Sequence, residues 1–555
     1  MGTSAVHPAA LPDKISIAIP SRRAISRDPL LEPQTSQGVT SEAPSPSSEQ
    51  TVDSIITRIG FGKFQRRMLW LCGLGWLADN MWLQCVANIL PRVQRHFGVH
   101  DQAIGMMFSA IFTGMMVGAL FWGTFADRYG RKQAFTWTLC LSTGFGLAAS
   151  VAPSFPWLCC LLFGLGLGVG GNMPVDGAIF LEFIPHTHRY LLTLLSVFFS
   201  AGAVVASMAA LLWLPSFSCP PELDHKTTRG VPITASLATT CDVHQENNGW
   251  RYLLFTLGVL NGGMLLARVA FFRSQESPKF LVRHNRCEDA VVVLQHIVRY
   301  NGDDMDISMR DFSRHSEDSS CSDSVTSYSP RRTCTSVRGL IDGWLHPFRP
   351  LFAPRLRRTT LLVWSIWALV ALGYTMVNAF LPKLLEARNS PIAAAAHAST
   401  APDLAAVYRQ ALVYALGSLP GPLVGAFLVQ TILRRRGSMA ACAFGAALAL
   451  GVFASSPAGW ATTTSSTLFN LLAGTMYAII YSYTPEVFDT ALRGSACGIA
   501  SALGRVAGIL APLLAGWLWR WSAQALLYTS MLTLGIAGLH MIALPAESQV
   551  VVTTL

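Results

Sequence analysis

Charged side chains are scarce in this sequence. Asp, Glu, Lys and Arg make up only 13% of its 555 residues, whereas 51% of the residues are hydrophobic. Soluble globular proteins carry roughly 25% charged residues, and a soluble chain of this length would need a polar surface around several domains. The composition therefore excludes a soluble enzyme, a disordered protein and a fibrous protein. It leaves a polytopic membrane protein.

Chemical signatures of other function classes are missing as well. The sequence has no phosphate-binding loop of the form G-x-x-x-x-G-K-[ST], so direct use of ATP is not supported. The apolar segments contain no histidine cluster and no nucleophile–base pair, and the cysteines show no metal-ligand spacing. We therefore expect no enzyme activity, no metal and no cofactor. The net charge of +10 comes from short basic clusters between apolar stretches, which fit cytoplasmic loops better than a nucleic-acid partner.

Long apolar segments recur from Met68 onward. Twelve of them can be distinguished, each about 18–25 residues long, which is enough to cross the hydrocarbon core of a bilayer. Six lie between residues 68 and 272, and six more lie between residues 359 and 544. The pattern predicts an all-α membrane protein with twelve transmembrane helices in two pseudo-symmetric six-helix bundles.

The polar stretches divide the chain around these segments. The first 50 residues are rich in Ser, Pro, Thr and Ala and cannot bury enough apolar surface to fold. The predicted organisation is a disordered cytoplasmic N-terminal tail at 1–57, an N-terminal six-helix bundle at 58–275, a cytoplasmic central loop at 276–358, a C-terminal six-helix bundle at 359–545 and a cytoplasmic C-terminal tail at 546–555. Within the central loop, we expect a short amphipathic helix on the membrane surface at 276–300 and a disordered Ser-rich part at 304–338.

Basic residues indicate the orientation of the segments and also a repeat. Clusters at 128–132 and 434–436 follow the second and the eighth segment, so both lie on one side, which the positive-inside bias makes cytoplasmic. Three pairs of residues share an offset of 304 positions and equivalent places in the two halves: Arg131 and Arg435, Glu182 and Glu486, and Arg189 and Arg493. These matches predict a duplicated six-helix unit, as in transporters built from two related halves.

Several motifs resemble one family of membrane transporters. The stretch GTFADRYGRK at 123–132 resembles the signature loop between helices 2 and 3 of the major facilitator superfamily. Glu276 followed by Ser-Pro-Lys is similar to the motif after helix 6 of the sugar porters. The glycine-rich stretch 168–176 and the sequence Tyr-Thr-Pro-Glu at 483–486 resemble the branch that contains synaptic-vesicle-glycoprotein-like transporters. The segment at 359–381 lacks the Gln-rich start that is usual in sugar carriers, which argues against a hexose substrate.

A few polar residues inside the predicted helices are candidates for binding. A charge in the membrane core is unfavourable, so Asp79 is expected to bind a proton or a cationic substrate group, with a structural hydrogen bond as the alternative. Arg505 is expected to hold a substrate carboxylate or to pair with an acid across the cavity, with helix packing as the alternative. Arg268 lies near the end of its segment and is expected to extend to the inner membrane surface. Further candidates are Asp176, Tyr374 and Asn378.

A second set of charges lies near the cytoplasmic ends of the helices. The family resemblance implies that these residues form a salt-bridge network that holds the inner gate shut while the carrier faces outward. The alternative is that they only set the membrane topology. The members in the first half are Asp127, Arg131, Glu182, Arg189 and Glu276, and the counterparts in the second half are Arg435, Glu486 and Arg493.

Two cysteines stand apart from those in the apolar segments. Cys219 and Cys241 lie in the outer loop predicted at 215–250. On a non-cytoplasmic face of the membrane such a pair forms either a disulfide or two free thiols.

Together these features predict a secondary active transporter of a small organic solute that works by alternating access and is coupled to protons. Its partners are then the lipid bilayer, the solute and protons, without nucleic acid. We expect it in the plasma membrane or in a vacuolar or vesicular membrane. The alternatives are an efflux pump that exports a metabolite or toxic compound, and a non-transporting nutrient receptor that signals through the Ser-rich loop.

Overall fold

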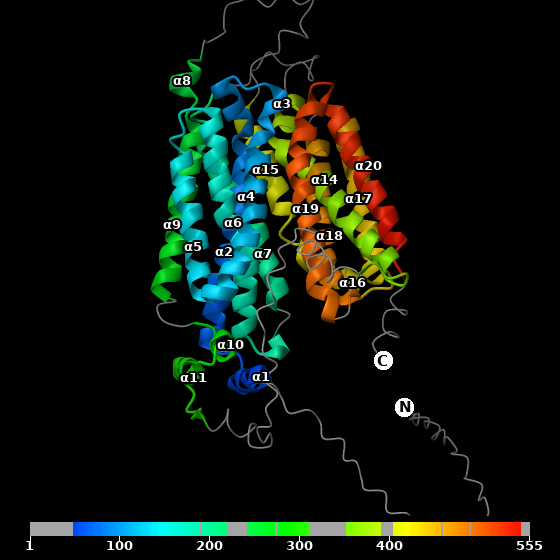
Figure 1. The fold of residues 1–555 in the computed structure, drawn as a ribbon. Coiled ribbons are helices and arrows are strands. Elements are labelled where there is room, and N and C mark those ends of the chain that lie inside the picture. The colour runs from blue at the N-terminus through cyan, green and yellow to red at the C-terminus, as the bar shows by residue number, and fades with distance from the viewer. Residues whose placement is uncertain are drawn as a thin grey trace, which may run out of the picture. The chain divides into compact units, whose positions relative to one another are not determined.

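The computed structural model describes most of the chain, and the regular structure in this part is helical. The described residues are 48–188, 191–219, 241–271, 276–309, 351–389, 403–456, 459–488 and 490–545. Residues Pro46–Leu555 form one compact unit (Figure 1). The predicted tail at 1–57 up to residue 47, most of the Ser-rich stretch at 304–338, and the C-terminal tail at 546–555 lie outside the described residues.

The first half of this unit contains six long helices. They are α2 (Lys63–Phe97), α4 (Met106–Tyr129), α5 (Arg131–Ala149), α6 (Phe155–Phe183), α7 (Leu191–Trp213) and α9 (Gly249–Phe271). Short helical turns connect some of them: α3 (Asp101–Ile104), η1 (His186–His188) and α8 (Val243–Glu246).

The second half repeats this organisation with one interruption. Its helices are α14 (Arg357–Arg388), α15 (Leu404–Gly417), α16 (Gly421–Val429), α17 (Arg434–Ser455), α18 (Trp460–Val487), α19 (Thr490–Trp519) and α20 (Ala523–Ile542). The eighth predicted segment is divided into α15 and α16, because Pro420 and Pro422 lack the N–H groups that would continue α15 and are tolerated in the first turn of a new helix. With α15 and α16 counted as one interrupted span, twelve spans are described, and the predicted all-α architecture is confirmed.

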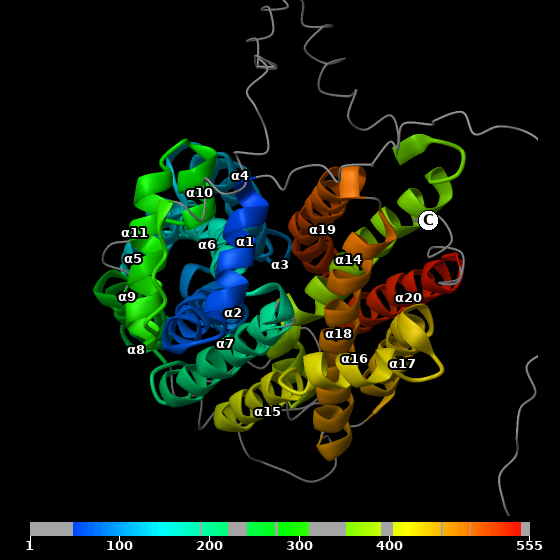
Figure 2. The ribbon, with the colours of Figure 1, turned by 90° about the horizontal axis from the view of Figure 1, so that it is seen from below.

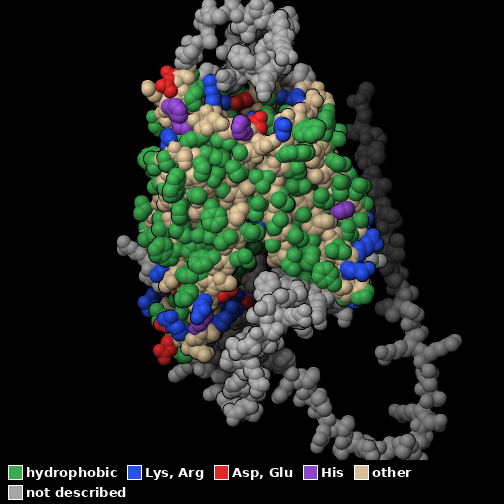
Figure 3. All heavy atoms as spheres, turned by 45° about the horizontal axis from the view of Figure 1, so that its top comes forward, with side chains coloured by type: hydrophobic (Ala, Val, Ile, Leu, Met, Phe, Trp, Pro, Cys, Tyr) green, Lys and Arg blue, Asp and Glu red, His purple; other side chains and the backbone are tan. Residues whose placement is uncertain are grey.

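The two groups of six spans lie side by side, with α7 of the first group next to α15 of the second (Figure 2). A broad hydrophobic belt covers the face seen in Figure 3, and charged side chains gather at its two ends. Nine helical stretches in the described residues are long and apolar enough to cross a membrane by themselves. We call the end with the loop between α4 and α5 the basic end, and the end with Cys219 and Cys241 the disulfide end.

Glycines allow α4 and α6 to pack with their backbones in contact. A Cβ atom at Gly114 or Gly118 of α4 would overlap the backbone of α6, and one at Gly166 or Gly170 of α6 would overlap the backbone of α4. Both helices therefore carry a small-residue pair at i and i+4, which permits close packing in membranes. This contact fixes the polar residues of α6 that follow the glycines.

Three helices at the basic end differ from the sequence-based expectation. Helix α1 (Ser48–Ile59) lies within the segment expected to be a disordered tail, because its apolar side chains at i, i+3, i+4 and i+7 form one buried face: Val52, Ile55, Ile56 and Ile59. The single surface helix expected at 276–300 is instead two helices, α10 (Pro278–Arg283) and α11 (Cys287–Asn301). Their apolar residues share a buried cluster with α1 and α2, so they pack on protein.

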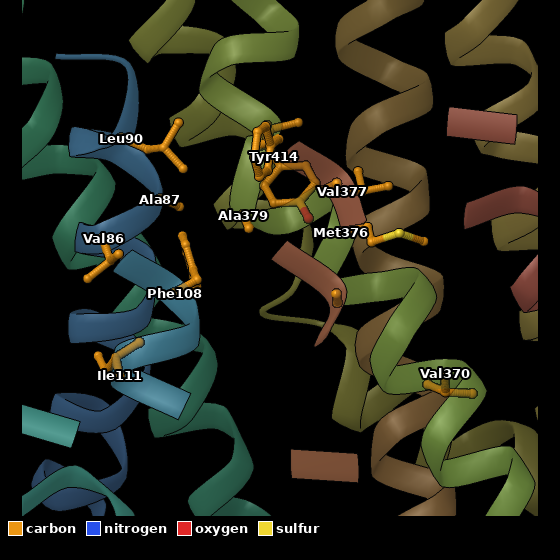
Figure 4. Close-up of a cluster of buried hydrophobic side chains, with 14 of the residues drawn as sticks. Val86, Ala87, Leu90, Phe108, Ile111, Val370, Met376, Val377, Ala379 and Tyr414 are labelled. Atoms are coloured by element: carbon orange, nitrogen blue, oxygen red, sulfur yellow. The ribbon is translucent and has the colours of Figure 1, made fainter. Parts of the chain in front are cut away.

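The hydrophobic core continues from one half to the other. In Figure 4, Leu90 of α2 and Phe108 of α4 lie on one side, with Val377 of α14 and Tyr414 of α15 opposite them. This cluster places α2 and α14, the first long helices of the two halves, at the centre of the fold.

Candidate functional site

Asp79 lies in the buried interior of the first half. Its side chain has no exposed surface, and its Oδ1 accepts a hydrogen bond of 2.7 Å from Nδ2 of Asn172 on α6. The other carboxyl oxygen, Oδ2, is buried without a hydrogen-bond partner among the described residues. The interhelical hydrogen bond given above as the alternative role of Asp79 is therefore present, and the second carboxyl oxygen has no hydrogen-bond partner among the described residues.

One helical turn closer to the basic end, a second buried carboxylate has a cation. Asp176 Oδ2 and Arg268 Nη2 are 2.5 Å apart, and both side chains are fully buried. Arg268 also donates to the carbonyl oxygen of Phe135 at 2.5 Å and lies over the Phe135 ring. The expected extension of Arg268 to the membrane surface is therefore wrong. Its helix α9 packs on α5, which turns the side chain inward to Asp176.

The Asp176–Arg268 pair needs space on α2. Gly75 lies one turn before Asp79, and a Cβ atom there would overlap both Asp176 and Arg268. The antiparallel helices α2 and α6 thus meet at two successive levels: Asp79 bonds to Asn172 at the first, and Asp176 lies against Gly75 at the second. Only the second level contains a cation, which is Arg268.

Arg505 of α19 extends from the second half toward this site. Its Nη1 donates a hydrogen bond of 2.9 Å to the carbonyl oxygen of Met115 on α4. Its guanidinium group interacts electrostatically with Asp79 and with Tyr481 of α18. The structure therefore brings the candidates Asp79, Asp176 and Arg505 into one region, in which Asp79 interacts electrostatically with Asp176, Arg268 and Arg505.

Tyr374 and Asn378 lie on α14 in a separate network of the second half. The Tyr374 hydroxyl donates to Asn470 Oδ1 at 3.2 Å, and the Tyr414 hydroxyl donates to Asn378 Oδ1 at 3.1 Å. Asn470 Nδ2 in turn donates to the carbonyl oxygen of Tyr414 at 2.8 Å. Asn378 is thus buried in a link between α14 and α15, whereas Tyr374 stays partly exposed.

The charges at the basic end pair within each half. Arg131 bonds to Asp127 at 2.8 Å and to Glu182 at 3.3 Å, and the Glu276 carboxylate accepts the backbone N–H groups of Arg131 and Lys132 at 2.9 and 3.2 Å. In the second half, Arg435 pairs with Glu486. Arg189 lies outside the described residues, and the side chain of Arg493 is not described. Each of these described pairs lies within one half of the protein.

A glycine makes the contact with Glu276 possible. Gly130, between α4 and α5, has φ of 112°, a backbone conformation that side chains disfavour, and a Cβ atom there would meet the Glu276 carboxylate. The turn thereby presents the first N–H groups of α5 to an anion.

The described ion pairs between the halves lie at the disulfide end, where sequence reasoning named no charged candidate residues. Arg92 of α2 bonds to Glu386 of α14 at 2.5 Å, and Lys383 of α14 pairs with Asp101 of α3. No local sequence pattern connects Arg92 with Glu386, since the two residues lie in different halves of the chain.

The disulfide end is also tied to the outer loop of the first half. Cys219 and Cys241 form a disulfide, and the carbonyl oxygen of Cys219 accepts a hydrogen bond of 2.6 Å from Arg92 Nη1. These two cysteines and Glu246 lie close enough to suggest a metal site, but the thiols are bonded to each other and offer no thiolate ligand.

The comparison with known proteins agrees with these features. The sequence profile described as the Major Facilitator Superfamily matches residues 69–408. The chain is also 32% identical to the protein named MFS siderochrome iron transporter 1 of Ceriporiopsis subvermispora, over 84% of this chain and 84% of the relative. The chain belongs to the major facilitator superfamily. It is accordingly a multi-pass membrane protein of a transporter family.

Other members of the superfamily support the branch and the fold. The synaptic vesicle 2-related protein of Bos taurus is 26% identical, over 84% of this chain and 75% of the relative, which confirms the predicted similarity to that branch. The structure of the xylose transporter XylE from E. coli in a partially occluded inward-open conformation has a TM-score of 0.60, at 12% identity, and covers 87% of this chain and 100% of its own. This likeness confirms the major-facilitator fold.

Proposed function

We propose that this chain is a secondary active transporter that moves a small organic solute together with protons by alternating access. The observation that carries the proposal is the state of Asp79, a buried carboxyl group with one free oxygen and no ion pair among the described residues. The membrane in which it works is, in this proposal, the plasma membrane or a vacuolar or vesicular membrane.

The contrast between Asp79 and Asp176 supports a proton as the coupling ion. Asp176 has a cation at 2.5 Å, so its negative charge is compensated inside the first half. An uncompensated carboxylate in a low-dielectric interior is unfavourable, and taking up a proton removes the charge without moving another group. Asp79 can therefore gain and lose a proton as the site becomes accessible from either side.

The distribution of contacts between the halves supports alternating access. Contacts between them include the hydrogen bond from Arg505 to Met115 and, at the disulfide end, the pair of Arg92 and Glu386. Opening at that end requires these ion pairs to break, and closing at the basic end requires new contacts there. Such exchange of contacts is how packed halves switch between discrete states.

The proposal is tested with Asp79→Asn. The asparagine can still accept the hydrogen bond from Asn172, so the variant removes proton binding and keeps the interhelical contact. We expect cells with the native chain to accumulate or release a solute in a pH-dependent manner, measured by untargeted metabolite analysis at acidic and neutral external pH. In Asp79→Asn, the dependence on pH should disappear. The matched control is Asp403→Asn, because Asp403 is an exposed carboxylate at the start of α15.

The outcomes separate the alternatives. A pH dependence that survives in Asp79→Asn would remove Asp79 from the coupling mechanism. The sign of the metabolite change distinguishes uptake from the efflux pump. If no solute moves with the native chain, transport itself is the wrong function and the nutrient receptor takes its place.

A further inference from the structure

A row of aromatic side chains in the second half has no role in the function described so far. Trp367 of α14 contacts Tyr481 of α18 edge-on, with ring centroids 4.8 Å apart. Tyr477, one turn from Tyr481 on α18, lies 6.5 Å from it and 5.6 Å from Tyr374 of α14. The rings form a continuous surface along two facing helices.

This aromatic row borders on the space between the halves. Tyr481 is 52% exposed, although it contacts the nearly buried Trp367 and interacts electrostatically with Arg505, which itself bonds to the first half. A side chain with such neighbours exposes its free surface toward the other half. Tyr477 and Tyr374 are partly exposed beside it. In the described part of the chain, the hydroxyl groups of Tyr477 and Tyr481 have no hydrogen-bond partner.

Arg505 supplies a charge at the end of this surface. One N–H group of Arg505 donates to the carbonyl oxygen of Met115, and the guanidinium group has no other protein acceptor among the described residues. The remaining N–H groups form a planar fork, which matches the two oxygens of a carboxylate. A planar ring that lies along the tyrosines can therefore place its carboxylate on Arg505.

We propose that this surface binds a small aromatic carboxylic acid as its anion, with the carboxylate on Arg505 and the ring against Tyr477 and Tyr481. This inference rests on the proposed transport function and names its substrate class. The aromatic faces supply contact area and offset-stacked or edge-to-face ring contacts, and the two tyrosine hydroxyls serve polar ring substituents.

The position of Asp79 links this anion to the proton. The charged and titratable groups around Asp79 are Asp176 of α6, Arg268 of α9 and Arg505 of α19, and Asn172 supplies its hydrogen bond. Arg268 is already paired with Asp176 at 2.5 Å. When Asp79 is neutral, Arg505 has no nearby anion and can accept the substrate carboxylate. Proton and anion then bind cooperatively, and affinity for the anion rises as pH falls.

Three probes of similar size test the substrate class on the purified full-length chain. Benzoate has both the ring and the charge, cyclohexanecarboxylate has the charge without the aromatic ring, and benzamide has the ring without the charge. We expect calorimetry to detect benzoate, and to give affinities lower by about tenfold or more for the other two. Benzoate affinity should rise from about pH 7.5 to about pH 5.5, a range in which carboxylic acids stay ionised.

Variants assign the contacts. Arg505→Gln should abolish benzoate binding, and Arg505→Lys, which keeps the charge but loses the fork, should weaken it. Tyr481→Phe should retain binding, whereas Tyr481→Leu should reduce it. The control is Arg520→Gln, an exposed arginine just after the same helix.

Each outcome decides a separate claim. Equal binding of cyclohexanecarboxylate overturns the aromatic requirement, and equal binding of benzamide overturns the carboxylate requirement. Because these comparisons use the native chain, they do not depend on the folding of a variant. If no probe binds but a different solute still moves in a pH-dependent manner that requires Asp79, the substrate class is wrong and the proposed function stands.

Discussion

Arg92 and Glu386 form an ion pair between the two halves of the protein. Their side chains are 2% and 11% exposed, the atoms Nη2 and Oε1 are 2.5 Å apart, and the residues lie 294 positions apart in the chain. Arg92 lies near the C-terminal end of α2 and Glu386 near that of α14, so the pair joins the first long helices of both halves at the disulfide end. In the proposed alternating-access cycle, this contact has to break for the protein to open at that end.

Removal of one member of this pair should destabilise the structure strongly. In Arg92→Gln the Glu386 carboxylate stays buried without its cation, and in Glu386→Gln the arginine does. Losing one partner of a buried pair costs about 3–5 kcal/mol, so we expect a clear fall in Tm for each single variant. The double variant Arg92→Gln with Glu386→Gln should lose less than either single variant, because no uncompensated charge remains.

An exposed pair supplies the control for this experiment. Arg409 and Asp403 of the same unit are 2.9 Å apart, and their side chains are 63% and 59% exposed. Arg409→Gln should leave Tm nearly unchanged, since exposed ion pairs contribute little. If Arg92→Gln and Arg409→Gln shifted Tm equally, the Arg92–Glu386 pair would not be a coupled contact. The same would follow if the stability losses of Arg92→Gln and Glu386→Gln simply added in the double variant.

Gly75 should tolerate no side chain. A methyl group there would overlap Asp176 and Arg268, which are held in a fully buried pair, so Gly75→Ala should cost about 1–3 kcal/mol and reduce transport. Gly263→Ala on α9 is the matched change, because nothing lies within 4 Å of its Cβ position. The check is thermal unfolding of both variants in the same detergent. If the Gly75→Ala protein were as stable as the Gly263→Ala protein, the Asp176–Arg268 pair would be able to move away from the added methyl group.

The sequence predicts the number and order of the spans well, because the length and polarity of each segment are local properties. It also indicates Asp79 and Asp176 as candidate binding residues, since a charged residue inside an apolar segment can be recognised without a structure. The partner of each charge depends on which helices pack together. Arg268 was therefore placed at the membrane surface, although the packing of α9 on α5 turns it toward Asp176.

Two further features were hidden for the same reason. The ion pair of Arg92 and Glu386 joins residues from different halves, and no local pattern connects them. Helix α1 has a visible apolar period in Val52, Ile55, Ile56 and Ile59, but the polar composition of the preceding residues masked it. Composition averages over a long window, whereas four side chains are enough to dock a short helix on α10 and its neighbours.

The attachment of α1 should depend on pH through Asp53. This residue pairs with Lys279 of α10 and with His186, whose Nε2 is 3.0 Å from Asp53 Oδ2. Partial burial opposes ionisation of Asp53, but the hydrogen bonds and charges of Lys279 and His186 outweigh it and hold the pKa of this carboxyl below its usual value. A lowered pKa means that the pairing contributes stability above the usual Asp range and loses it as pH falls through the lowered pKa.

Hydrogen exchange in α1 can measure this contribution. At neutral pH, Asp53→Asn should lower the protection of α1 by about 1 kcal/mol relative to the native chain. Below about pH 4 the difference should begin to shrink, and it should vanish once the pH has fallen through the lowered pKa and the native carboxyl is also neutral. Arg58→Gln, an exposed change on the same helix, serves as the control. A difference that stays constant down to low pH would indicate that Asp53 acts without its charge.

Arg131 should influence which end of the transporter is open. In this structure ion pairs join the halves at the disulfide end, and the Arg131 side chain pairs with Asp127 and Glu182 of its own half. If its network stabilises the state that is closed at the basic end, Arg131→Gln should shift the population toward the state joined at the disulfide end. Loss of a partly buried charged hydrogen bond of about 1.4 kcal/mol corresponds to about a tenfold change in such an equilibrium.

A cysteine in place of Tyr481 reports this shift, because that side chain is half exposed and interacts electrostatically with Arg505, which bonds to the first half. In a background without other reactive cysteines, maleimide added from the basic side should label Tyr481→Cys faster when Arg131→Gln is present. Glu182→Gln should act in the same direction, and Arg435→Gln should do so through Glu486 in the second half. Arg128→Gln, an exposed neighbour in the same loop, should leave the labelling rate unchanged. If Arg128→Gln and Arg131→Gln alter labelling equally, these charges set the membrane topology and do not control the gate.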